Sequence, residues 1–435
     1  MAAWSRLRST YWFVPAVMTA AAAALAVAGV AIDRNTAADA PWLVWAYGGG
    51  ADGARALLSA VAGSTITVVS LTFSVTIVAL TVSAQHFGPR LLSNFMRDTA
   101  AQVVLGMFIG TFAFCLLVLR TVRAEGDAYA QFIPHLSVTL AVVLAMLSVA
   151  ALIYYLHHVA ASIQVSQIAL NVTRDLEAAI DRLYPAHAAN EPEPAEVPRP
   201  ERPPEAGTVC ARRSGYVQAI DLDAVVSVAE RHGAVVWLRA RPGDFVIEGG
   251  PLAGVLPAVA DDDGVADAVR GAYVLGADRT AWQDAEFAVQ QLVEVALHAL
   301  SPGINEPFTA ITCIDRLGQG LSRLAERRVP AAVLMDGARQ PRVVAVPKGF
   351  GSLLRAAFDP IVLFAGANPA IYSRLLDTLA ALGDRARRPA DREAIAAQAV
   401  AVRNGARPHV QDERHRNAIE ELFAEVIAAV GERPR

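Results

Sequence analysis

Residues 57–83 form an apolar stretch without a charged side chain, and the stretch is long enough to cross a lipid bilayer. A helix needs about 20 mainly apolar residues to span the hydrocarbon core, where its backbone groups must bond within the helix. Hydroxyl side chains recur in nearly every turn of this stretch, at Ser59, Ser64, Thr65, Thr67, Ser70, Thr72, Ser74, Thr76, Thr81 and Ser83. The sequence therefore predicts a membrane-spanning helix with a partly polar surface.

Some of these hydroxyls share one face of the predicted helix. Positions three, seven and fourteen residues apart lie close together around a helix, and this spacing links Thr67, Ser70, Ser74 and Thr81. We call these four residues the hydroxyl stripe. Neutral oxygens along a stripe can partly replace the hydration shell of an ion without trapping it. Serine and threonine also pack membrane helices, bonded to the i−4 carbonyl or to a neighbouring helix, so pore lining and helix packing both stay open.

Apolar residues are concentrated in the first 160 residues of the chain. Over all 435 residues the hydrophobic share is 54%, more than a soluble globular protein usually carries. A signal peptide is the competing interpretation of the first apolar segment, since Arg6 and Arg8 precede it, but its apolar run is longer than usual for one. We therefore predict a transmembrane domain over residues 1–160 with four spans, at about residues 11–32, 57–83, 101–119 and 133–156.

The orientation of the spans follows from topology more than from charge. Arginines flank the spans on both sides in similar number, so the positive-inside rule does not decide the orientation. Four spans put both termini on one side, and the large charged C-terminal half is most easily left in the cytoplasm. We therefore predict a multi-pass membrane protein with both termini in the cytoplasm.

The C-terminal half divides into several predicted segments. A helical extension of the fourth span covers residues 161–189, and a proline-rich linker covers residues 190–207. A β-rich unit follows over residues 208–279, and a mostly helical lobe with one strand at residues 343–346 occupies residues 280–435. The turns of the β-rich unit make it similar to small barrel-sandwich folds that carry lipoyl or biotinyl groups, but it has no lysine to attach one. The predicted fold is a membrane α-helical domain with four transmembrane helices, followed by a cytoplasmic α+β domain with a small barrel-sandwich-like β unit and a helical C-terminal lobe.

Two helix ends in the lobe are candidates for a small polar ligand site. Asp284 follows a possible capping box at residues 280–283 and suits the positive end of a helix dipole. That helix stops at residues 301–303, and Asn305 and Glu306 open the next one. Capping by Asn305 and a chain reversal explain these residues structurally. In the functional interpretation, Asp284, Asn305, Glu306 and the two helix N-termini hold an ion or a small polar ligand.

Four segments carry a resemblance to a known family: LTFSVTIVAL at residues 71–80, QHFGPRLL at 85–92, GYVQ at 215–218 and ALSPGINEP at 299–307. They resemble the bacterial predicted-membrane-protein family called domain of unknown function 2254, and the likeness covers most of the chain. In the family's usual form of the last motif, arginine and aspartate stand at the positions of His298 and Glu306, exchanges that keep the charge type but change its reach. The resemblance implies a bacterial inner-membrane protein with several spans and a cytoplasmic domain.

We expect a homo-oligomeric inner-membrane ion channel or channel-like transport protein with a cytoplasmic regulatory domain. One four-helix subunit offers little room for a hydrated pore, so a hydroxyl stripe that avoids lipid is best placed at a symmetry axis. The path would have a mouth formed by Gln85, His86, Arg90 and Arg97, where the two arginines favour anions if they face inward. Expected partners are membrane lipid, further copies of the chain and a small ion or solute.

A non-conducting membrane sensor or scaffold, whose cytoplasmic domain binds a ligand or partner, is the alternative. We do not expect an enzyme, because the sequence has no nucleophile elbow, metalloprotease motif or phosphate-binding loop. Cys115, Cys210 and Cys313 lie far apart and fit no zinc or disulfide pattern, so no metal site or cofactor is expected. A net charge of −4 with neither sign dominant gives no reason to expect nucleic acid as a partner.

Overall fold

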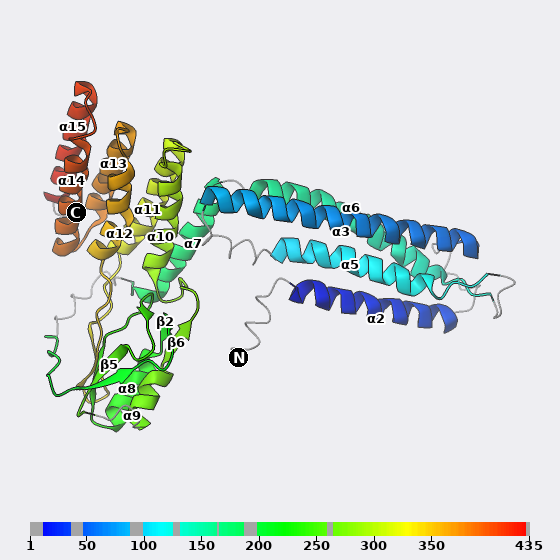
Figure 1. Ribbon diagram of the computed structural model, residues 1–435, viewed down its shortest axis with the longest axis horizontal. Coiled ribbons are helices and arrows are strands. Elements are labelled where there is room, and N and C mark those ends of the chain that lie inside the picture. Colours follow the sequence, from blue (N-terminus) through cyan, green and yellow to red (C-terminus); the bar gives the residue numbers. More distant parts are fainter. Residues whose placement is uncertain are drawn as a thin grey trace. The chain divides into compact units, whose positions relative to one another are not determined.

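The structure is a computed structural model, and it describes residues 12–35, 47–87, 99–124, 131–162, 165–186, 198–258 and 264–431. Side chains are described throughout these ranges except at residues 82–87, 160–162 and 165–166. The chain divides into two compact units, Met1–Gln167 and Ile168–Arg435. We call them the membrane unit and the C-terminal unit (Figure 1).

Four long apolar helices make up the described part of the membrane unit: α2 (Phe13–Asn35), α3 (Ala51–Phe87), α5 (Thr99–Leu119) and α6 (His135–Ser162). Each has the length and composition needed to cross a membrane, which confirms the prediction of four apolar membrane helices (Figure 1). The longest candidate span is Ala51–Thr81 in α3. It is long because no charge or proline interrupts the sequence between Arg55 and the end of the helix.

The helix α5 is central in this unit and contacts α2, α3 and α6. Two glycines let α2 approach it closely, since a Cβ atom at Gly106 would lie 2.7 Å from the sulfur of Met18 and one at Gly110 would lie 3.2 Å from the Cβ of Ala22. Farther along α5, Phe114 is fully buried in a core to which all four helices contribute. Small residues thus bring the helices together, and larger ones fill the space between them.

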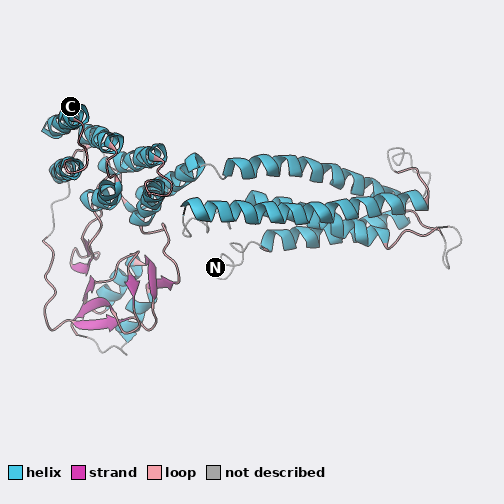
Figure 2. Cartoon of the chain, turned by 45° about the horizontal axis from the view of Figure 1, so that its top comes forward, coloured by secondary structure: helices cyan, strands magenta, loops and turns pink. Residues whose placement is uncertain are grey.

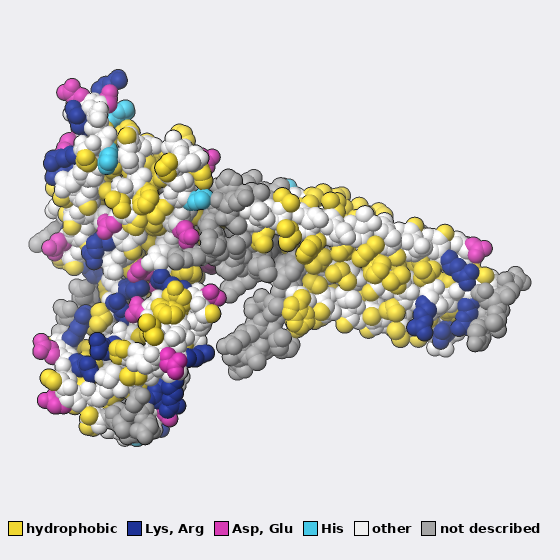
Figure 3. Space-filling view, in the orientation of Figure 1, with side chains coloured by type: hydrophobic (Ala, Val, Ile, Leu, Met, Phe, Trp, Pro, Cys, Tyr) yellow, Lys and Arg dark blue, Asp and Glu magenta, His cyan; other side chains and the backbone are white. Residues whose placement is uncertain are grey.

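Asp33 at the end of α2 caps the start of α6. Its carboxylate accepts hydrogen bonds from the backbone N–H groups of Leu136 (2.9 Å) and Ser137 (3.0 Å) and from the hydroxyl of Ser137 (2.6 Å). The first N–H groups of a helix have no partner within the helix, so the carboxylate satisfies them. Figure 3 shows hydrophobic side chains along the visible face of the membrane unit, with arginine side chains gathered toward one end.

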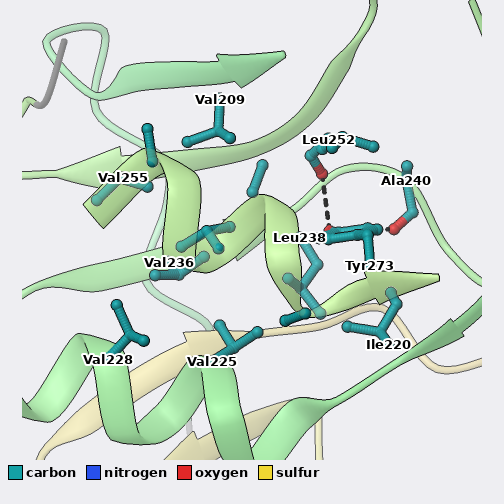
Figure 4. Packing of buried hydrophobic residues seen from close by; sticks show 14 of the residues in the cluster. Val209, Ile220, Val225, Val228, Val236, Leu238, Ala240, Leu252, Val255 and Tyr273 are labelled. Carbon is teal, nitrogen blue, oxygen red and sulfur yellow. Dashed lines mark hydrogen bonds between the residues drawn. The ribbon is translucent and has the colours of Figure 1, made fainter. Parts of the chain in front are cut away.

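The C-terminal unit contains two small sheets. The larger has the strand order β1 (Gly207–Cys210), β5 (Pro251–Leu256), β3 (Val235–Leu238), β8 (Pro341–Val344) and β7 (Val333–Met335). The smaller has the order β4 (Phe245–Val246), β2 (Gly215–Ile220) and β6 (Tyr273–Gly276). Both sheets share one buried core with the helices α8 (Leu222–Arg231) and α9 (Gly264–Gly271). Figure 4 shows Val225 and Val228 of α8 turned toward Val236 and Leu238 of β3.

A strand from the predicted helical lobe completes the larger sheet. β3 pairs in parallel with β8, where Val236 lies opposite Val343 and Trp237 opposite Val344. β7 then pairs with β8 in the antiparallel sense. The sequence predicted a strand at residues 343–346 within the helical lobe, but not its pairing with a strand of the β-rich unit. Without β8, the buried strand β3 would leave one row of backbone N–H and C=O groups unpaired.

Helices make up the rest of the described C-terminal unit, as predicted. They are α7 (Val165–Leu183), α10 (Ala285–Ala299), α11 (Pro307–Ala325), α12 (Phe350–Phe364), α13 (Pro369–Arg385), α14 (Pro389–Ala406) and α15 (Glu413–Gly431). Proline occupies the first turn of α11, α13 and α14, where a missing N–H leaves no bond unmade. Neighbouring helices pack side by side (Figure 2). Asp181 of α7 pairs with Arg323 of α11 at 2.5 Å.

Asp336 fixes the hairpin between β7 and β8. Its carboxylate accepts hydrogen bonds from the backbone N–H of Gln340 (2.8 Å), from Nε of Arg342 (2.7 Å) and from the backbone N–H of Ala338 (2.9 Å). These bonds, led by the one from Gln340, hold the pKa of Asp336 below its usual range. A carboxylate with a lowered pKa stabilises the fold above its unfolded pKa, and this contribution is lost as the pH falls through the folded pKa.

We predict that Asp336→Asn lowers the melting temperature of the full-length protein at pH 7 and reduces the further loss of stability below about pH 4. Thermal unfolding in detergent micelles, followed by tryptophan fluorescence, measures both effects, because Trp237 lies in β3 beside β8. Asp384→Asn, at an exposed position of α13, is the control and should change neither quantity. An unaltered pH profile in Asp336→Asn would contradict the assignment.

Candidate functional site

The hydroxyl stripe lies on a face of α3 that no other described helix of the chain covers. All four of its residues are exposed. By contrast, Thr65 and Thr72 on the opposite face are only 6% and 3% exposed. The described neighbours of α3 are α5 and α6, and they pack against that opposite face. The stripe therefore points away from the helices of its own chain.

Every hydroxyl of the stripe is bonded within its own helix. Thr67, Ser70, Ser74 and Thr81 donate to the carbonyls of Gly63, Ile66, Ser70 and Ile77, at 2.9, 3.3, 2.9 and 2.8 Å respectively. These bonds use the one O–H donor of each side chain and leave the oxygen lone pairs available. The stripe is therefore, in chemical terms, a row of acceptor oxygens.

Small residues extend the stripe toward the N-terminal end of α3. Ala56, Ala60 and Gly63 share its face, and all three are exposed. Small residues let two membrane helices approach closely, whereas large exposed side chains beside them, such as Phe73, suit lipid. Large exposed side chains also interrupt the stripe, at Leu71 between Thr67 and Ser74 and at Ile77 and Val78 between Ser74 and Thr81. This face of α3 thus combines small size with exposed oxygens.

A hydroxyl and a carbonyl on the opposite face of α3 bond to a neighbouring helix. The hydroxyl of Tyr155 on α6 donates to the carbonyl of Thr72 at 3.1 Å, and its oxygen lies 2.5 Å from the hydroxyl of Thr76. Tyr155 is buried between the helices. On this face Thr76 thus contacts α6, whereas the hydroxyl of Thr65 donates to the carbonyl of Val61 within α3 at 2.6 Å.

The predicted pore mouth falls outside what the structure describes in side-chain detail. Gln85 and His86 lie in the last turn of α3, but their side chains are not among the described ones. Arg90 and Arg97 lie outside the described residues altogether. The role of these four residues at a pore mouth stays a prediction.

The predicted ligand corner is divided between two ends of one helix. Asp284 precedes the first turn of α10, whereas Asn305 and Glu306 follow its last turn. A helix of 15 residues rises about 22 Å, so the three side chains do not share a site. Asn305 is exposed with φ +50°, a left-handed conformation that asparagine tolerates, and Glu306 accepts a bond from the hydroxyl of Thr309 at 3.2 Å.

Asp284, which is buried, instead belongs to a ring of charges whose other members are partly buried. Its carboxylate binds Arg279, with Oδ2 3.1 Å from Nε and 2.5 Å from Nη2, and its Oδ1 lies 3.3 Å from Nζ of Lys348. Lys348 also lies 2.8 Å from Oε2 of Glu286. Gln290 closes the ring, since it accepts from Nη1 of Arg279 at 2.6 Å and donates to Oε1 of Glu286 at 2.9 Å. Two cations and two anions neutralise one another in this charge ring, as buried charges require.

The charge ring joins the strands of the C-terminal unit to its helices. Gly243, in the turn after β3, has φ +94°, and a Cβ atom there would collide with the carboxylate of Asp284. Glycine alone suits both this conformation and this close approach. The hydroxyl of Tyr184 donates to the carbonyl of Lys348 at 2.8 Å. Burial raises the pKa of Tyr184, and the nearby carboxylates of Asp284 and Glu286 raise it further.

The sequence contained only part of this arrangement. The helix dipole argument placed Asp284 and Glu286 at the start of a helix, and the structure confirms that position. The same argument did not predict that Lys348, 64 residues away from Asp284, lies beside these carboxylates. One signal was nevertheless present, because Lys348 is the only lysine in the chain. Among so many arginines, a compact ammonium marks a place where one cation bridges two carboxylates in a small space.

We predict that Lys348→Met destabilises the C-terminal unit by about 3 kcal/mol, because it leaves the charge ring with one cation for two carboxylates. Adding Glu286→Gln should restore part of this loss, since it removes the surplus negative charge. Chemical denaturation of the full-length protein in detergent micelles measures both effects. Arg387→Met, at an exposed position, is the control. Strictly additive losses in the double variant would show that the two residues do not interact.

Comparison with known proteins is consistent with a membrane protein. The family model described as "Predicted membrane protein (DUF2254)" matches residues 8–381. Uncharacterized proteins of Mycobacterium bovis and Mycobacterium tuberculosis are each 33% identical to the chain over 386 residues, which is 88% of this chain and 73% of each relative. No solved structure matches the chain. The chain therefore belongs to the family of predicted membrane proteins named DUF2254.

Proposed function

We propose that the protein is one subunit of a homo-oligomeric ion channel or channel-like transporter, in which the hydroxyl stripes of several copies line a shared path. The observation that carries this proposal is the exposure of the stripe on a helix long and apolar enough to cross a membrane. Lipid tails offer polar oxygens no partner, so such a face is best covered by another copy of α3 or by water. The small residues Ala56, Ala60 and Gly63 supply the close approach that association needs.

The hydrogen bonds of the stripe indicate which kind of solute could move along it. The O–H groups of Ser70 and Ser74 are engaged by backbone carbonyls, so a solute beside them meets oxygen lone pairs. Lone pairs coordinate cations and accept hydrogen bonds from water, whereas an anion requires donors. The stripe itself therefore suits a small cation or a neutral solute. Arg90 and Arg97, if they form the mouth, would select in the opposite sense, and flux measurements separate the two.

Both termini and the C-terminal unit lie in the bacterial cytoplasm in this proposal, and the protein sits in the inner membrane. An even number of candidate spans supports having both termini on one side. Cys313 of the C-terminal unit is a buried thiol that forms no disulfide among the described residues, which suits a reducing compartment. The proposal gives the protein no catalytic role and requires no cofactor.

A non-conducting sensor or scaffold is the second candidate, and one observation favours it. Because each hydroxyl of the stripe is satisfied within its own helix, copies of α3 can pack face to face without water between them. The C-terminal unit would then carry the function by binding a ligand or partner. Both candidates require association of copies through the stripe, and only the first requires flux.

We predict that copies of the chain cross-link through the stripe. In a background with Cys210 replaced by serine, Ser74→Cys should give linked dimers in native membranes under an oxidant or a short bis-maleimide. Met146→Cys, at a 66% exposed position of α6, is the matched control and should remain monomeric. If neither Ser70→Cys nor Ser74→Cys cross-links at reagent levels that modify both fully, the proposal that copies associate through this face is contradicted.

Flux measurements distinguish the two candidates. Purified protein in liposomes should release a trapped small cation or neutral solute, and the double variant Ser70→Ala, Ser74→Ala should slow that release about tenfold, which is about 1.4 kcal/mol of barrier. Alanine removes the oxygens without adding bulk. Ser64→Ala removes an exposed hydroxyl of α3 that lies off the stripe, so its flux should match the wild type. If the wild type forms intact oligomers but shows no flux, the channel proposal is contradicted and the sensor or scaffold remains.

A further inference from the structure

An arginine-lined pocket lies in the C-terminal unit beside α9 and the strands β5 and β6. Its volume is about 450 Å³, which falls within the range of small-molecule sites. Arg212 and Arg213 reach it from the turn after β1, and Arg270 from the last turn of α9. Tyr273 and Leu275 of β6 form part of its apolar wall. The pocket thus places three guanidinium groups beside an apolar surface.

The charges that line the pocket are not balanced. Asp267 is the one acidic residue in the lining, and two guanidinium groups share it: Nη2 of Arg212 lies 2.7 Å from Oδ1, and Arg270 pairs with the same oxygen. Arg213 donates from Nη2 to the carbonyl of Leu275 at 2.7 Å, which is a neutral acceptor. Among the described residues of the lining, three cations therefore stand against one carboxylate, an excess of positive charge that the charge ring at Asp284 does not have.

The fold holds one of these arginines in place. The side chain of Arg270 is only 8% exposed, and its Nε donates to the carbonyl of Cys210 at 2.8 Å. Arg212 and Arg213 lie at exposed positions, so water reaches them. A guanidinium fixed by the main chain presents its donors in a constant geometry, which suits recognition of a phosphate or carboxylate. One anchored arginine and two accessible ones are the elements of an oxyanion site.

We propose that this pocket binds the phosphate group of a small phosphomonoester. Arg212, Arg213 and Arg270 surround the phosphate, and the organic part of the ligand lies against Tyr273 and Leu275. A phosphomonoester carries nearly two negative charges at pH 7, which matches the positive excess of the lining. The volume exceeds what a phosphate group alone requires, so an organic part is expected. A soluble phosphoester and a phospholipid headgroup share this chemistry, and the inference does not depend on conduction through α3.

Isothermal titration of the full-length protein in non-ionic detergent tests the proposal with three probes. AMP carries a phosphomonoester on a soluble nucleoside, adenosine lacks the phosphate, and dihexanoyl phosphatidic acid carries the phosphate on a lipid. We expect AMP, the short-chain phosphatidic acid or both to bind with a Kd below about 1 mM, and adenosine to show no binding. Binding of AMP alone identifies a soluble source, and binding of phosphatidic acid alone identifies a headgroup. Failure of both phosphate-bearing probes to bind overturns the proposal.

Variants at the two accessible arginines connect the binding to this pocket. Arg212→Gln and Arg213→Gln should each weaken binding of the phosphate-bearing probe at least fivefold, because each removes a charge-assisted bond. Arg231→Gln removes the same charge from an exposed position of α8 in the same unit and should leave the Kd unchanged. Melting curves show which variants are folded. Wild-type affinity in both Arg212→Gln and Arg213→Gln would place the binding elsewhere and overturn the proposal.

Discussion

A bilayer offers no water to a polar side chain, and this constraint governs how the hydroxyls of α3 are arranged. Each hydroxyl of the stripe bonds to the carbonyl four residues earlier, and on the opposite face the hydroxyl of Thr76 meets Tyr155 of α6. Bonding of this kind allows α3 to remain polar along much of its length without unsatisfied donors on the stripe. It does not explain why small and polar residues gather on the one face that lacks a partner helix within the chain. The association of several copies through that face, which we propose, would explain it.

The C-terminal unit meets a related constraint with charges. In the charge ring, Lys348 and Arg279 neutralise Asp284 and Glu286, and the turn at Gly243 closes over the carboxylate. Removing any one member would leave a buried charge without its partner, so the ring favours a single arrangement of strands and helices. The arginine-lined pocket differs, because its described lining has three arginines and one carboxylate, with which two of the arginines pair. The charges are thus balanced in the charge ring, which connects strands to helices. They are unbalanced in the arginine-lined pocket, where a bound anion would neutralise the excess.

Local patterns in the sequence predicted the parts of the fold that depend on local physics. Hydropathy and length were sufficient for the four membrane helices, and the sequence predicted a helix opening at Asn305 and Glu306, directly before α11 begins at Pro307. Helical spacing placed the hydroxyl stripe on one face, but the side on which α5 and α6 pack is a tertiary property. The errors concern residues that are distant in the sequence. The predicted ligand corner placed Asp284 beside Asn305, whereas the two lie at opposite ends of α10. The predicted β-rich unit did not include β8, which pairs with β3. Neither the direction of a helix nor a pairing between distant strands has a local signature.

The central claim is that copies of the chain meet at the exposed face of α3. Electron cryomicroscopy of the full-length protein in lipid nanodiscs tests it most directly, because the method shows both the number of copies and the surroundings of each helix. The account predicts a symmetric assembly in which Ser70 and Ser74 of every copy face the symmetry axis. A monomer surrounded by lipid, or an assembly in which these two residues face the lipid, would contradict it.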